Sequence, residues 1–333
     1  MSVPVLVTGG AGYVGSHCCK ALAYAGYTPV VYDNLTTGHR WAVKWGPLEE
    51  GDVLDRARLD AVIAKHKPVA ALHFAALSQV GESMSEPARY WRVNVAGSLT
   101  LLEALIAAGV KNFVFSSTAA IFGIPDRVPI VEDQPHAPIN PYGQSKLAVE
   151  RILTDFTAAY GLRATALRYF NAAGADADSE IGEDHSPESH LIPLVLDAAA
   201  GRRPDIAMFG EDYATPDGTC LRDYIHVADL ADAHVLALKR LIGGGETRFF
   251  NLGNGNGFSV REVIAAAKRV TGRDFVVRAA PRRPGDPPSL VADATQAKAT
   301  LGWAPQRAAL EVQIADAWRW HVAHFLAAKG TEA

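Results

Sequence analysis

A tyrosine and a lysine four positions apart carry the most specific chemistry in this sequence. They are Tyr142 and Lys146, which lie in the run Tyr-Gly-Gln-Ser-Lys directly after Pro141. Residues four apart lie on the same face of a helix. A free tyrosine has a pKa near ~10 and is a poor base at neutral pH, but a neighbouring ammonium group favours the phenolate. The pair therefore predicts a general base that removes a proton from a hydroxyl group.

Three hydroxyl residues follow the apolar run Phe113–Phe115. They are Ser116, Ser117 and Thr118. A hydroxyl at the end of a strand can hydrogen-bond the substrate oxygen that the tyrosine deprotonates. We predict this role for Thr118, with Ser117 as the alternative, although a hydroxyl at a strand end also serves as an ordinary helix N-cap.

Glycines join the first apolar run to the first expected helix. Gly9, Gly12 and Gly15 form a Gly-x-x-Gly-x-x-Gly pattern around the helix start at Tyr13. A side chain at position 9 or 12 would hold a pyrophosphate away from the backbone amides and the positive end of the helix dipole. The missing side chain at position 15 lets the helix pack closely on the strand. This loop predicts a dinucleotide site.

The second apolar run ends at Asp33. A carboxylate at this place accepts the ribose hydroxyls of NAD and repels the 2′-phosphate of NADP. The sequence therefore predicts NAD, with NADP as the alternative because His39 or Arg40 could serve a phosphate. Asp52 and Val53 follow the next apolar element and are expected to cap the adenine, unless they form a plain surface turn.

The elements that must position these residues alternate in the first half of the chain. Apolar runs cover Val3–Thr8, Thr28–Asp33, Ala70–Phe74, Asn112–Ser117 and Arg163–Tyr169, and helical patterns cover Tyr13–Ala25, Arg56–Lys65, Glu86–Ile106 and Pro141–Tyr160. Continuous apolar strands separated by helices indicate a parallel sheet that is covered on both faces. The fold class is thus α/β, with a doubly wound Rossmann-type sheet whose ligand crevice lies at the carboxyl ends of the strands.

The pattern changes after Phe170. We expect a loop at Asn171–Ser189, helices at Leu191–Ala200, Asp229–Ile242 and Leu310–Ala328, a short strand and turns in Asp205–Asp217, a strand at Phe249–Leu252, and an irregular proline-rich loop at 281–288. The predicted domains are an NAD-binding domain at 1–170, to which 226–252 returns, and a smaller C-terminal α/β substrate-binding domain at 171–333.

Composition narrows the classes of protein. With 333 residues, of which 49% are hydrophobic, the chain is long enough for two lobes. A net charge of −4 gives no basic excess of the kind that nucleic-acid binders carry. We expect no secretory signal, and no uncharged apolar run reaches the roughly 18 residues that a membrane span needs. The three cysteines Cys18, Cys19 and Cys220 make a poor disulfide framework. We expect a cytoplasmic protein without nucleic-acid, membrane or metal binding.

Longer motifs throughout the chain match one enzyme family. They are Val7–His17, Asp33–Leu35, His73–Ala76, Val80–Ser83, Pro141–Lys146, Leu167–Asn171, Asp217–Thr219, Arg222–Val227 and Ala280–Asp286. The first motif and the Tyr-Lys motif are general, whereas Arg222–Val227 and Ala280–Asp286 are far more specific. On these residues the sequence resembles the UDP-galactose 4-epimerases of the extended short-chain dehydrogenase/reductase family over nearly its whole length.

The resemblance implies a set of cofactor and substrate contacts. NAD is expected to bind through Gly9, Gly12, Tyr13, Val14, Gly15, Asp33, Asn34, Asp52, Val53, Phe74, Ala75, Ala76, Asn94, Ser116, Tyr142, Lys146 and Tyr169. The UDP-sugar is expected to bind through Thr118, Tyr142, Asn171, Leu191, Ala207, Met208, Phe209, Arg222, Tyr224, Arg283, Asp286 and Leu290. In this set Leu191 lies over the uracil, Asp286 holds the uridine ribose, and Arg222 and Arg283 clamp the diphosphate, a role that suits a bidentate guanidinium group.

The sequence departs from the family pattern at four places. Phe122 replaces a tyrosine, Ser78 a lysine, and His190 an asparagine. Position 290 is small in relatives that accept N-acetylated sugars and tyrosine in those that exclude them. Leu290 is intermediate, so conversion of UDP-GlcNAc and UDP-GalNAc stays an alternative.

The implied reaction is the reversible C4 epimerisation of UDP-glucose and UDP-galactose through a transient 4-keto sugar, with tightly bound NAD. A 4,6-dehydratase is disfavoured because Ala119 and Ala120 follow Thr118 where those enzymes carry acids. A UDP-pentose (xylose/arabinose) 4-epimerase and a non-catalytic NAD-sensing protein are the remaining alternatives. The family also implies a homodimer through the helices Glu86–Ile106 and Pro141–Tyr160.

Overall fold

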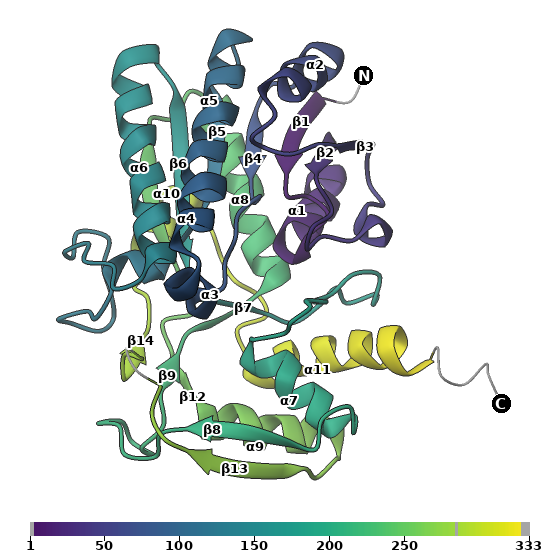
Figure 1. Cartoon of the computed structure of the whole chain (residues 1–333), viewed down its shortest axis with the longest axis vertical. Coiled ribbons are helices and arrows are strands. Elements are labelled where there is room, and N and C mark those ends of the chain that lie inside the picture. Colours follow the sequence, from purple (N-terminus) through teal and green to yellow (C-terminus); the bar gives the residue numbers. More distant parts are fainter. Residues whose placement is uncertain (1–2, 284–285, 328–333) are drawn as a thin grey trace.

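A seven-stranded parallel sheet forms the larger part of the molecule (Figure 1). The computed structural model describes residues 3–283 and 286–327. The strands are β1 (Val3–Thr8), β2 (Tyr27–Asp33), β3 (Leu48–Glu50), β4 (Ala71–His73), β5 (Asn112–Thr118), β6 (Arg163–Tyr169) and β11 (Arg248–Leu252). Their order is β11-β6-β5-β4-β1-β2-β3, and each neighbouring pair is parallel. The predicted doubly wound α/β fold is confirmed.

Helices cover both faces of this sheet because the strands are apolar on both sides. One layer holds α1 (Tyr13–Tyr24), α8 (Val227–Ile242) and α10 (Thr295–Leu301), and the other holds α2 (Arg56–His66), α5 (Gly97–Ala107) and α6 (Pro141–Tyr160). Val5 and Val7 are buried under α1 and α8, whereas Leu6 is buried under α2 and α5. Burying each such side chain contributes about 1.5–3 kcal/mol.

The strand order reverses between β1 and β4. The loops that leave these two neighbouring strands therefore run to opposite faces of the sheet and open a crevice at their carboxyl ends. The carbonyl oxygen of Thr8 accepts hydrogen bonds from the amides of Phe74 and Ala75, which ties the two loops together. These strand ends point toward the smaller part of the molecule (Figure 1).

The smaller part packs three helices around short strands. Its helices are α7 (Leu191–Ala199), α9 (Val260–Thr271) and α11 (Leu310–His321), and its longest strands, β8 (Asp205–Phe209) and β13 (Val276–Ala280), pair in parallel. Leu196, Val263 and Ile314 share its buried apolar core. Shorter pairings join it to the sheet side: β7 (Asn171–Ala173) with β10 (Tyr224–His226), and β9 (Leu221–Arg222) with β12 (Phe258–Ser259) and β14 (Ser289–Leu290).

The structure corrects several predicted elements. The single helix expected at Glu86–Ile106 is interrupted, because α4 (Pro87–Tyr90) continues through a π-helical turn at Trp91–Ala96 before α5 begins. Strand β3, helix α3 (Val80–Ser85) and helix α9 were not predicted, and the loop expected at Asn171–Ser189 begins with the strand β7. Helix α11 ends at His321 and a π-helical turn follows at Val322–Leu326; the predicted end at Ala328 lies outside the described residues.

Two further features bear on the sequence predictions. None of the helices in residues 3–283 and 286–327 is long and apolar enough to cross a bilayer. Cys18, Cys19 and Cys220 are free and buried.

Candidate active site

The glycine loop between β1 and α1 is constrained by its own backbone. Gly9 has a φ of +74°, and a Cβ there would lie 2.5 Å from the amide nitrogen of Ala75. A Cβ at Gly15 would lie 2.1 Å from the carbonyl oxygen of Gly9, so both positions need glycine for the fold itself. A Cβ at Gly12 would meet only that same oxygen, at an ordinary 3.4 Å. The protein therefore has room for a side chain at position 12. Glycine at this position is better explained by a ligand that binds close to the backbone, where a side chain would be in the way.

The start of α1 faces this loop with a fixed carboxylate beside it. Among the described residues no side chain caps the helix N-terminus at Gly12. Asp33 is buried, and its two carboxylate oxygens accept hydrogen bonds from the amides of Ala11 at 3.0 Å and Leu35 at 2.8 Å. Burial raises the pKa of Asp33, and these two amides oppose the rise. Free amides at a helix start and a carboxylate held at the end of β2 fit a dinucleotide.

Other residues predicted around the cofactor lie near this loop in different ways. The side chain of Asn34 donates to the Asp52 carboxylate at 2.9 Å, so this pair lies together beyond β2. Val53 is buried in the apolar core under α2 and α5. The Tyr13 hydroxyl donates to the carbonyl of Gly174 at 2.7 Å, which ties the loop to the segment after β7.

The residues after β4 line the same crevice. Phe74, Ala75 and Ala76 are half-buried, and the Phe74 ring lies 4.9 Å from the His234 ring. Val14 is half-buried and packs against the core under α1. Asn94 is buried, with its amide bonded to the backbone of Leu77 and to the Ser145 hydroxyl. Asn94 thus joins the loop after β4 to α6.

The structure brings Tyr142, Lys146 and Thr118 together at the carboxyl end of β5. Asn140 caps the start of α6 through the amide of Gly143 and so fixes where the helix begins. The Lys146 ammonium donates to the carbonyl of Ser116 at 2.9 Å and lies 6.0 Å from the centre of the Tyr142 ring. The side chain of Thr118 hydrogen-bonds Tyr142.

Burial governs the charge of this group. It raises the pKa of Tyr142, and the hydrogen bond from Thr118 acts against that rise. It also lowers the pKa of Lys146 to about 7, with Glu150 acting in the opposite direction. The sequence predicts that the lysine, together with the cationic ring of NAD, lowers the pKa of the tyrosine, whereas in the protein alone desolvation has the larger effect on both side chains. The phenolate therefore needs a further positive charge in the crevice.

Glu150 lies beneath this group and was missed by the sequence analysis. Its carboxylate accepts a hydrogen bond from the Ser117 hydroxyl at 2.6 Å and two from Arg168, at 2.7 and 3.0 Å, and all of these side chains are buried. Ser117 thus faces the protein interior, and Thr118 is the hydroxyl that reaches Tyr142. The available signal was spacing, because Glu150 follows Lys146 by four positions on α6.

Ser116 and Tyr169 lie side by side on neighbouring strands. The Ser116 hydroxyl hydrogen-bonds the Tyr169 hydroxyl; Ser116 lies near the carboxyl end of β5, and Tyr169 is the last residue of β6. Burial raises the pKa of Tyr169, so this phenol stays neutral. These hydroxyls form the edge of the crevice next to Lys146.

On the smaller part, six of the predicted substrate residues lie on four elements. Asn171 on β7 hydrogen-bonds the buried Tyr224 on β10. Leu191 begins α7. The three residues on β8 alternate: the side chain of Met208 lies in the apolar core, and Ala207 and Phe209 lie on the opposite face. Met208 can therefore reach a ligand through its backbone only.

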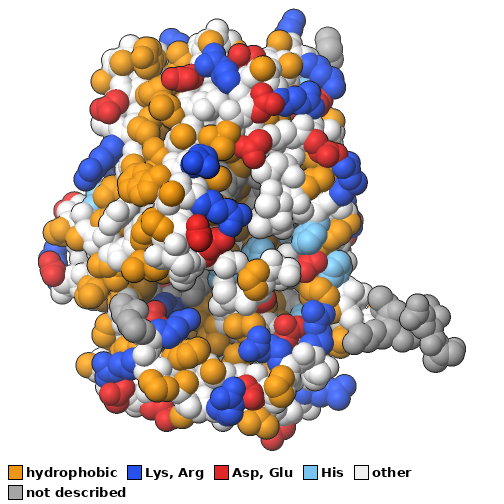
Figure 2. All heavy atoms as spheres, viewed as in Figure 1, with side chains coloured by type: hydrophobic (Ala, Val, Ile, Leu, Met, Phe, Trp, Pro, Cys, Tyr) orange, Lys and Arg blue, Asp and Glu red, His pale blue; other side chains and the backbone are white. Residues whose placement is uncertain are grey.

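Two arginines converge on one carboxylate. The guanidinium group of Arg222 lies 3.5 Å from the Asp286 carboxylate, and Arg283 donates to the same carboxylate at 2.9 Å. Arg222 is on β9 rather than on a loop, and it also donates to the carbonyl of Pro287. Figure 2 shows the surface hollowed where the larger and smaller parts meet, with Lys and Arg side chains on both parts near this junction. The paired guanidinium groups suit a diphosphate.

The residues that depart from the family pattern are placed as follows. Leu290 on β14 pairs in register with Arg222 and packs against the apolar cluster that contains the buried Phe122. Ser78 is exposed, and His190 precedes α7 at its N-terminus. Leu290 and Phe122 thus share one apolar wall, whereas the other two positions are at the surface.

Comparisons with known proteins agree with this geometry. Residues 5–253 match the model of the family described as "NAD dependent epimerase/dehydratase family". The chain is 55% identical to a UDP-glucose 4-epimerase of Rhizobium leguminosarum bv. trifolii over 95% of this chain and 97% of that protein. Among solved structures it is similar to the UDP-glucose 4-epimerase from Brucella ovis in complex with NAD, with a TM-score of 0.94, 52% identity, and coverage of 96% of this chain and 98% of the other.

A second solved structure is the UDP-glucose-4-epimerase from Stenotrophomonas maltophila with bound NAD and formylated UDP-arabinopyranose. It has a TM-score of 0.93 and 42% identity, and the alignment covers 96% of this chain and 98% of that one. The family match spans well over half of the chain, and the relatives are similar along nearly their whole length. The chain therefore belongs to the NAD dependent epimerase/dehydratase family.

Proposed function

We propose that this protein is an NAD-dependent isomerase that interconverts UDP-glucose and UDP-galactose by inverting C4 through a transient 4-keto sugar. The observation that carries the proposal is the group of Thr118, Tyr142 and Lys146 at the carboxyl end of the sheet. Its position at the carboxyl end of the sheet, together with the arginine pair on the smaller part, suits a sugar joined to a diphosphate. The family membership and the names of the relatives support the same activity.

The residues present fit NAD. The uncapped start of α1 and the open position at Gly12 suit the pyrophosphate, and Asp33 suits a ribose diol. When bound, NAD supplies a reversible acceptor for the hydrogen at C4 of the sugar. The division of roles that we propose gives cofactor binding to residues 1–170 and UDP-sugar binding to residues 171–333.

Tyr142 is the proposed base for the sugar 4-hydroxyl. Its phenolate takes the hydroxyl proton as C4 is oxidised and returns it when C4 is reduced. Thr118 holds the phenol through its hydrogen bond, which lowers the pKa of Tyr142 against the effect of burial. Lys146 in its protonated form supplies positive charge beside the phenol, and an oxidised nicotinamide ring held in the crevice would add to it. Activity should therefore rise with pH as Tyr142 ionises and fall again as Lys146 loses its proton.

Inversion requires the sugar to turn while the nucleotide stays bound. Arg222 and Arg283 are the proposed diphosphate ligands, and Asn171, Leu191 and the face of β8 with Ala207 are the proposed nucleotide contacts. These contacts fix the UDP end. A flat 4-keto sugar held mainly through its diphosphate can rotate about that link and present its other face.

Direct assay separates this proposal from its alternatives. Purified protein is incubated with a panel of UDP-hexoses, UDP-pentoses and UDP-N-acetylhexosamines, and the ratio of epimers is read by proton NMR. We expect UDP-glucose and UDP-galactose to reach equilibrium fastest. Preference for UDP-xylose or for UDP-GlcNAc would move the assignment to a pentose or N-acetylhexosamine epimerase. A protein that contains NAD and converts none of these substrates would be a sensor.

A matched pair of variants tests the role of the tyrosine. Tyr142→Phe removes the hydroxyl group that we assign as the base, and we expect its kcat to fall by at least about 100-fold. Tyr160→Phe removes the same group from the exposed end of α6 and serves as the control. Equal activity of the two variants would contradict the assignment.

We also propose that the protein is a cytoplasmic homodimer. Three free, buried cysteines suit a reducing compartment. Met84 on α3 and Trp91, which lies within the stretch Glu86–Ile106 predicted for the dimer interface, expose apolar side chains. Light scattering behind size-exclusion chromatography measures the mass, and we expect twice the 35.6 kDa of one chain.

A further inference from the structure

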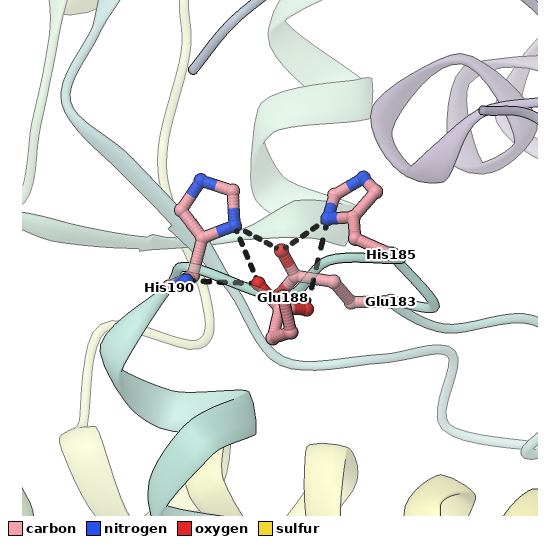
Figure 3. Close-up of side chains that lie close together, drawn as sticks. All are labelled: Glu183, His185, Glu188 and His190. Carbon is pink, nitrogen blue, oxygen red and sulfur yellow. Dashed lines mark hydrogen bonds and ion pairs between the residues drawn. The ribbon is translucent and has the colours of Figure 1, made fainter. Parts of the chain in front are cut away.

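Four side chains of one irregular segment converge on a common centre. They are Glu183, His185, Glu188 and His190 (Figure 3). Both imidazole rings present Nδ1 to the carboxylates. The Nδ1 atom of His185 lies 3.2 Å from an oxygen of Glu183 and 3.7 Å from an oxygen of Glu188. The Nδ1 atom of His190 lies 2.7 Å from an oxygen of Glu183 and 3.2 Å from an oxygen of Glu188. The four potential ligand atoms all lie within 4.8 Å of one another.

This cluster is partly enclosed by the protein. The side chain of Glu183 is 7% exposed and that of Glu188 is 12% exposed, whereas His190 is about half exposed. No helix or strand covers residues 183–190, so side-chain contacts must hold their backbone in place. The nearest neighbours are elements of the two ligand sites. The His185 ring contacts the Tyr13 ring at 6.4 Å, and His190 directly precedes α7.

The donor set is that of a transition-metal site. Imidazole nitrogens and carboxylate oxygens bind Zn²⁺ at about 2.0–2.2 Å in a tetrahedron. Ligand atoms at the corners of such a tetrahedron are about 3.3–3.6 Å apart, which follows from those bond lengths. One Glu183 oxygen lies 3.2 and 2.7 Å from the two imidazole nitrogens, and the two Glu188 oxygens lie 3.7 Å from His185 and 3.2 Å from His190, which is close to this range. All four ligand atoms lie within 4.8 Å of one another, so an ion can enter once the side chains draw closer together.

A neighbouring carboxylate cluster, at residues 176–180, is neutralised by a lysine instead. Asp176, Asp178 and Glu180 also gather three carboxylates, but the ammonium group of Lys20 lies among them at 2.8, 3.3 and 2.7 Å. A lysine that makes three such contacts keeps its proton and fills that centre. At residues 183–190 the positive partners are imidazoles, which bind metals as soon as they are neutral.

Protons and a metal ion compete for the same imidazoles. Each ring presents Nδ1, the atom that would bind the ion, to the carboxylates of Glu183 and Glu188. Two carboxylates with two protonated imidazoles, or with two neutral imidazoles and one divalent ion, have the same net charge of zero. A divalent ion thus replaces two protons without leaving an unpaired charge.

We propose that Glu183, His185, Glu188 and His190 bind one divalent transition-metal ion, with Zn²⁺ as the preferred ion. All four positions of the tetrahedron come from protein side chains, so the ion is structural rather than catalytic. The ion fixes residues 183–190, which contact Tyr13 of the dinucleotide loop and lead into α7. The sequence analysis predicted no metal site, and this inference does not depend on the proposed reaction.

The test measures metal binding by the untagged protein with its cofactor. The protein is treated with EDTA, freed of the chelator and dialysed against ZnCl₂ at pH 8, and bound zinc is measured by mass spectrometry. We expect one zinc per chain, and a thermal midpoint that rises with zinc concentration. Cobalt(II) in place of zinc should give the strong visible absorption of a tetrahedral site.

Three variants locate the ion. His185→Ala and His190→Ala should lose the single equivalent of zinc and the shift in thermal midpoint. Asp178→Asn changes an exposed carboxylate of the neighbouring cluster and should bind zinc as the wild type does. Circular dichroism and NAD content verify that each variant is folded. Because His190 is half exposed, His190→Ala is the variant that folding defects affect least.

Some results would overturn the proposal. One is a wild-type protein that retains less than one equivalent of zinc under these conditions and shows no tetrahedral cobalt spectrum. Another is a folded His190→Ala protein that keeps the zinc of the wild type. A third is loss of zinc from Asp178→Asn, which would place the ion at the neighbouring cluster. Loss of epimerase activity alone does not enter this test, so the two proposals fail separately.

Discussion

Lys146 should make the stability of the folded protein depend on pH. Its side chain is buried, and burial lowers its pKa from the ordinary 10.5 to about 7. In the unfolded chain the lysine regains its ordinary pKa, so between pH 7 and 10.5 the unfolded state binds more protons than the folded state. The free energy of unfolding that depends on this lysine must therefore rise with pH across that window.

The size of the effect follows from the two pKa values. At pH 7 keeping the lysine in the folded protein costs about 4 kcal/mol relative to the unfolded chain, and at pH 9 it costs about 2 kcal/mol. The variant Lys146→Met keeps an unbranched side chain and removes the titrating group. We expect its advantage in unfolding free energy over the wild type to be smaller at pH 9 than at pH 7 by about 2 kcal/mol.

Urea denaturation at the two pH values measures this difference. Wild type and variant are compared without NAD, because the ligand would add its own contribution. Comparing the difference between two proteins cancels the titration of other groups and the loss of the hydrogen bond to the Ser116 carbonyl. Lys111→Met, at an exposed lysine, is the control and should follow the wild type at both pH values. A Lys146→Met protein whose stability runs parallel to that of the wild type would refute the reasoning.

Three further predictions concern the crevice. Thr118→Val should lower kcat by about 100-fold and move the pH–rate profile to higher pH, because the hydrogen bond from Thr118 lowers the pKa of Tyr142. Ser117→Ala is the control and should lower kcat less, because the Ser117 hydroxyl bonds Glu150 instead. Equal losses of kcat in the two variants would contradict the role of Thr118. Arg222→Ala should raise the KM for UDP-glucose by about 10- to 100-fold, since charge-assisted hydrogen bonds to phosphate are lost. An unchanged KM in steady-state kinetics would show that Arg222 does not bind the diphosphate. Leu290→Ser should raise the ratio of kcat/KM for UDP-GlcNAc over UDP-glucose and Leu290→Tyr should lower it; the same ratio in both variants would show that this position does not select the sugar.

The sequence predicted the central sheet well because its strands carry a strong signal. The run Val3–Thr8 is apolar throughout and bounded by a glycine turn, and the strand has those bounds. Strand β3 (Leu48–Glu50) has three residues, two of them glutamates, and leaves no such pattern. Helix α9 was missed although Ser259 and Glu262 form a capping box that is visible in the sequence. The helix expected at Glu86–Ile106 was too long because periodicity alone does not reveal a π-helical turn.

Parts of the site were predictable for a similar reason. Tyr142 and Lys146 share a helix face, and Thr118 ends a strand whose carboxyl end must meet the crevice. The preference for Thr118 over Ser117 depends on Glu150, a partner that only the packed structure reveals. Spacing reports the neighbouring ammonium but not the desolvation, which raises the pKa of Tyr142 in the protein alone. The convergence of Glu183 with His190 likewise depends on how an irregular backbone folds back.

Epimerisation of UDP-glucose in heavy water tests the central claim most directly. If Tyr142 moves only the hydroxyl proton, and the hydrogen that leaves C4 returns to C4, the UDP-galactose formed should carry no deuterium at C4. Proton NMR of the product measures this in one experiment without added NAD. We expect UDP-galactose with full proton intensity at C4. Absence of UDP-galactose, or a product with deuterium at C4, would contradict the account.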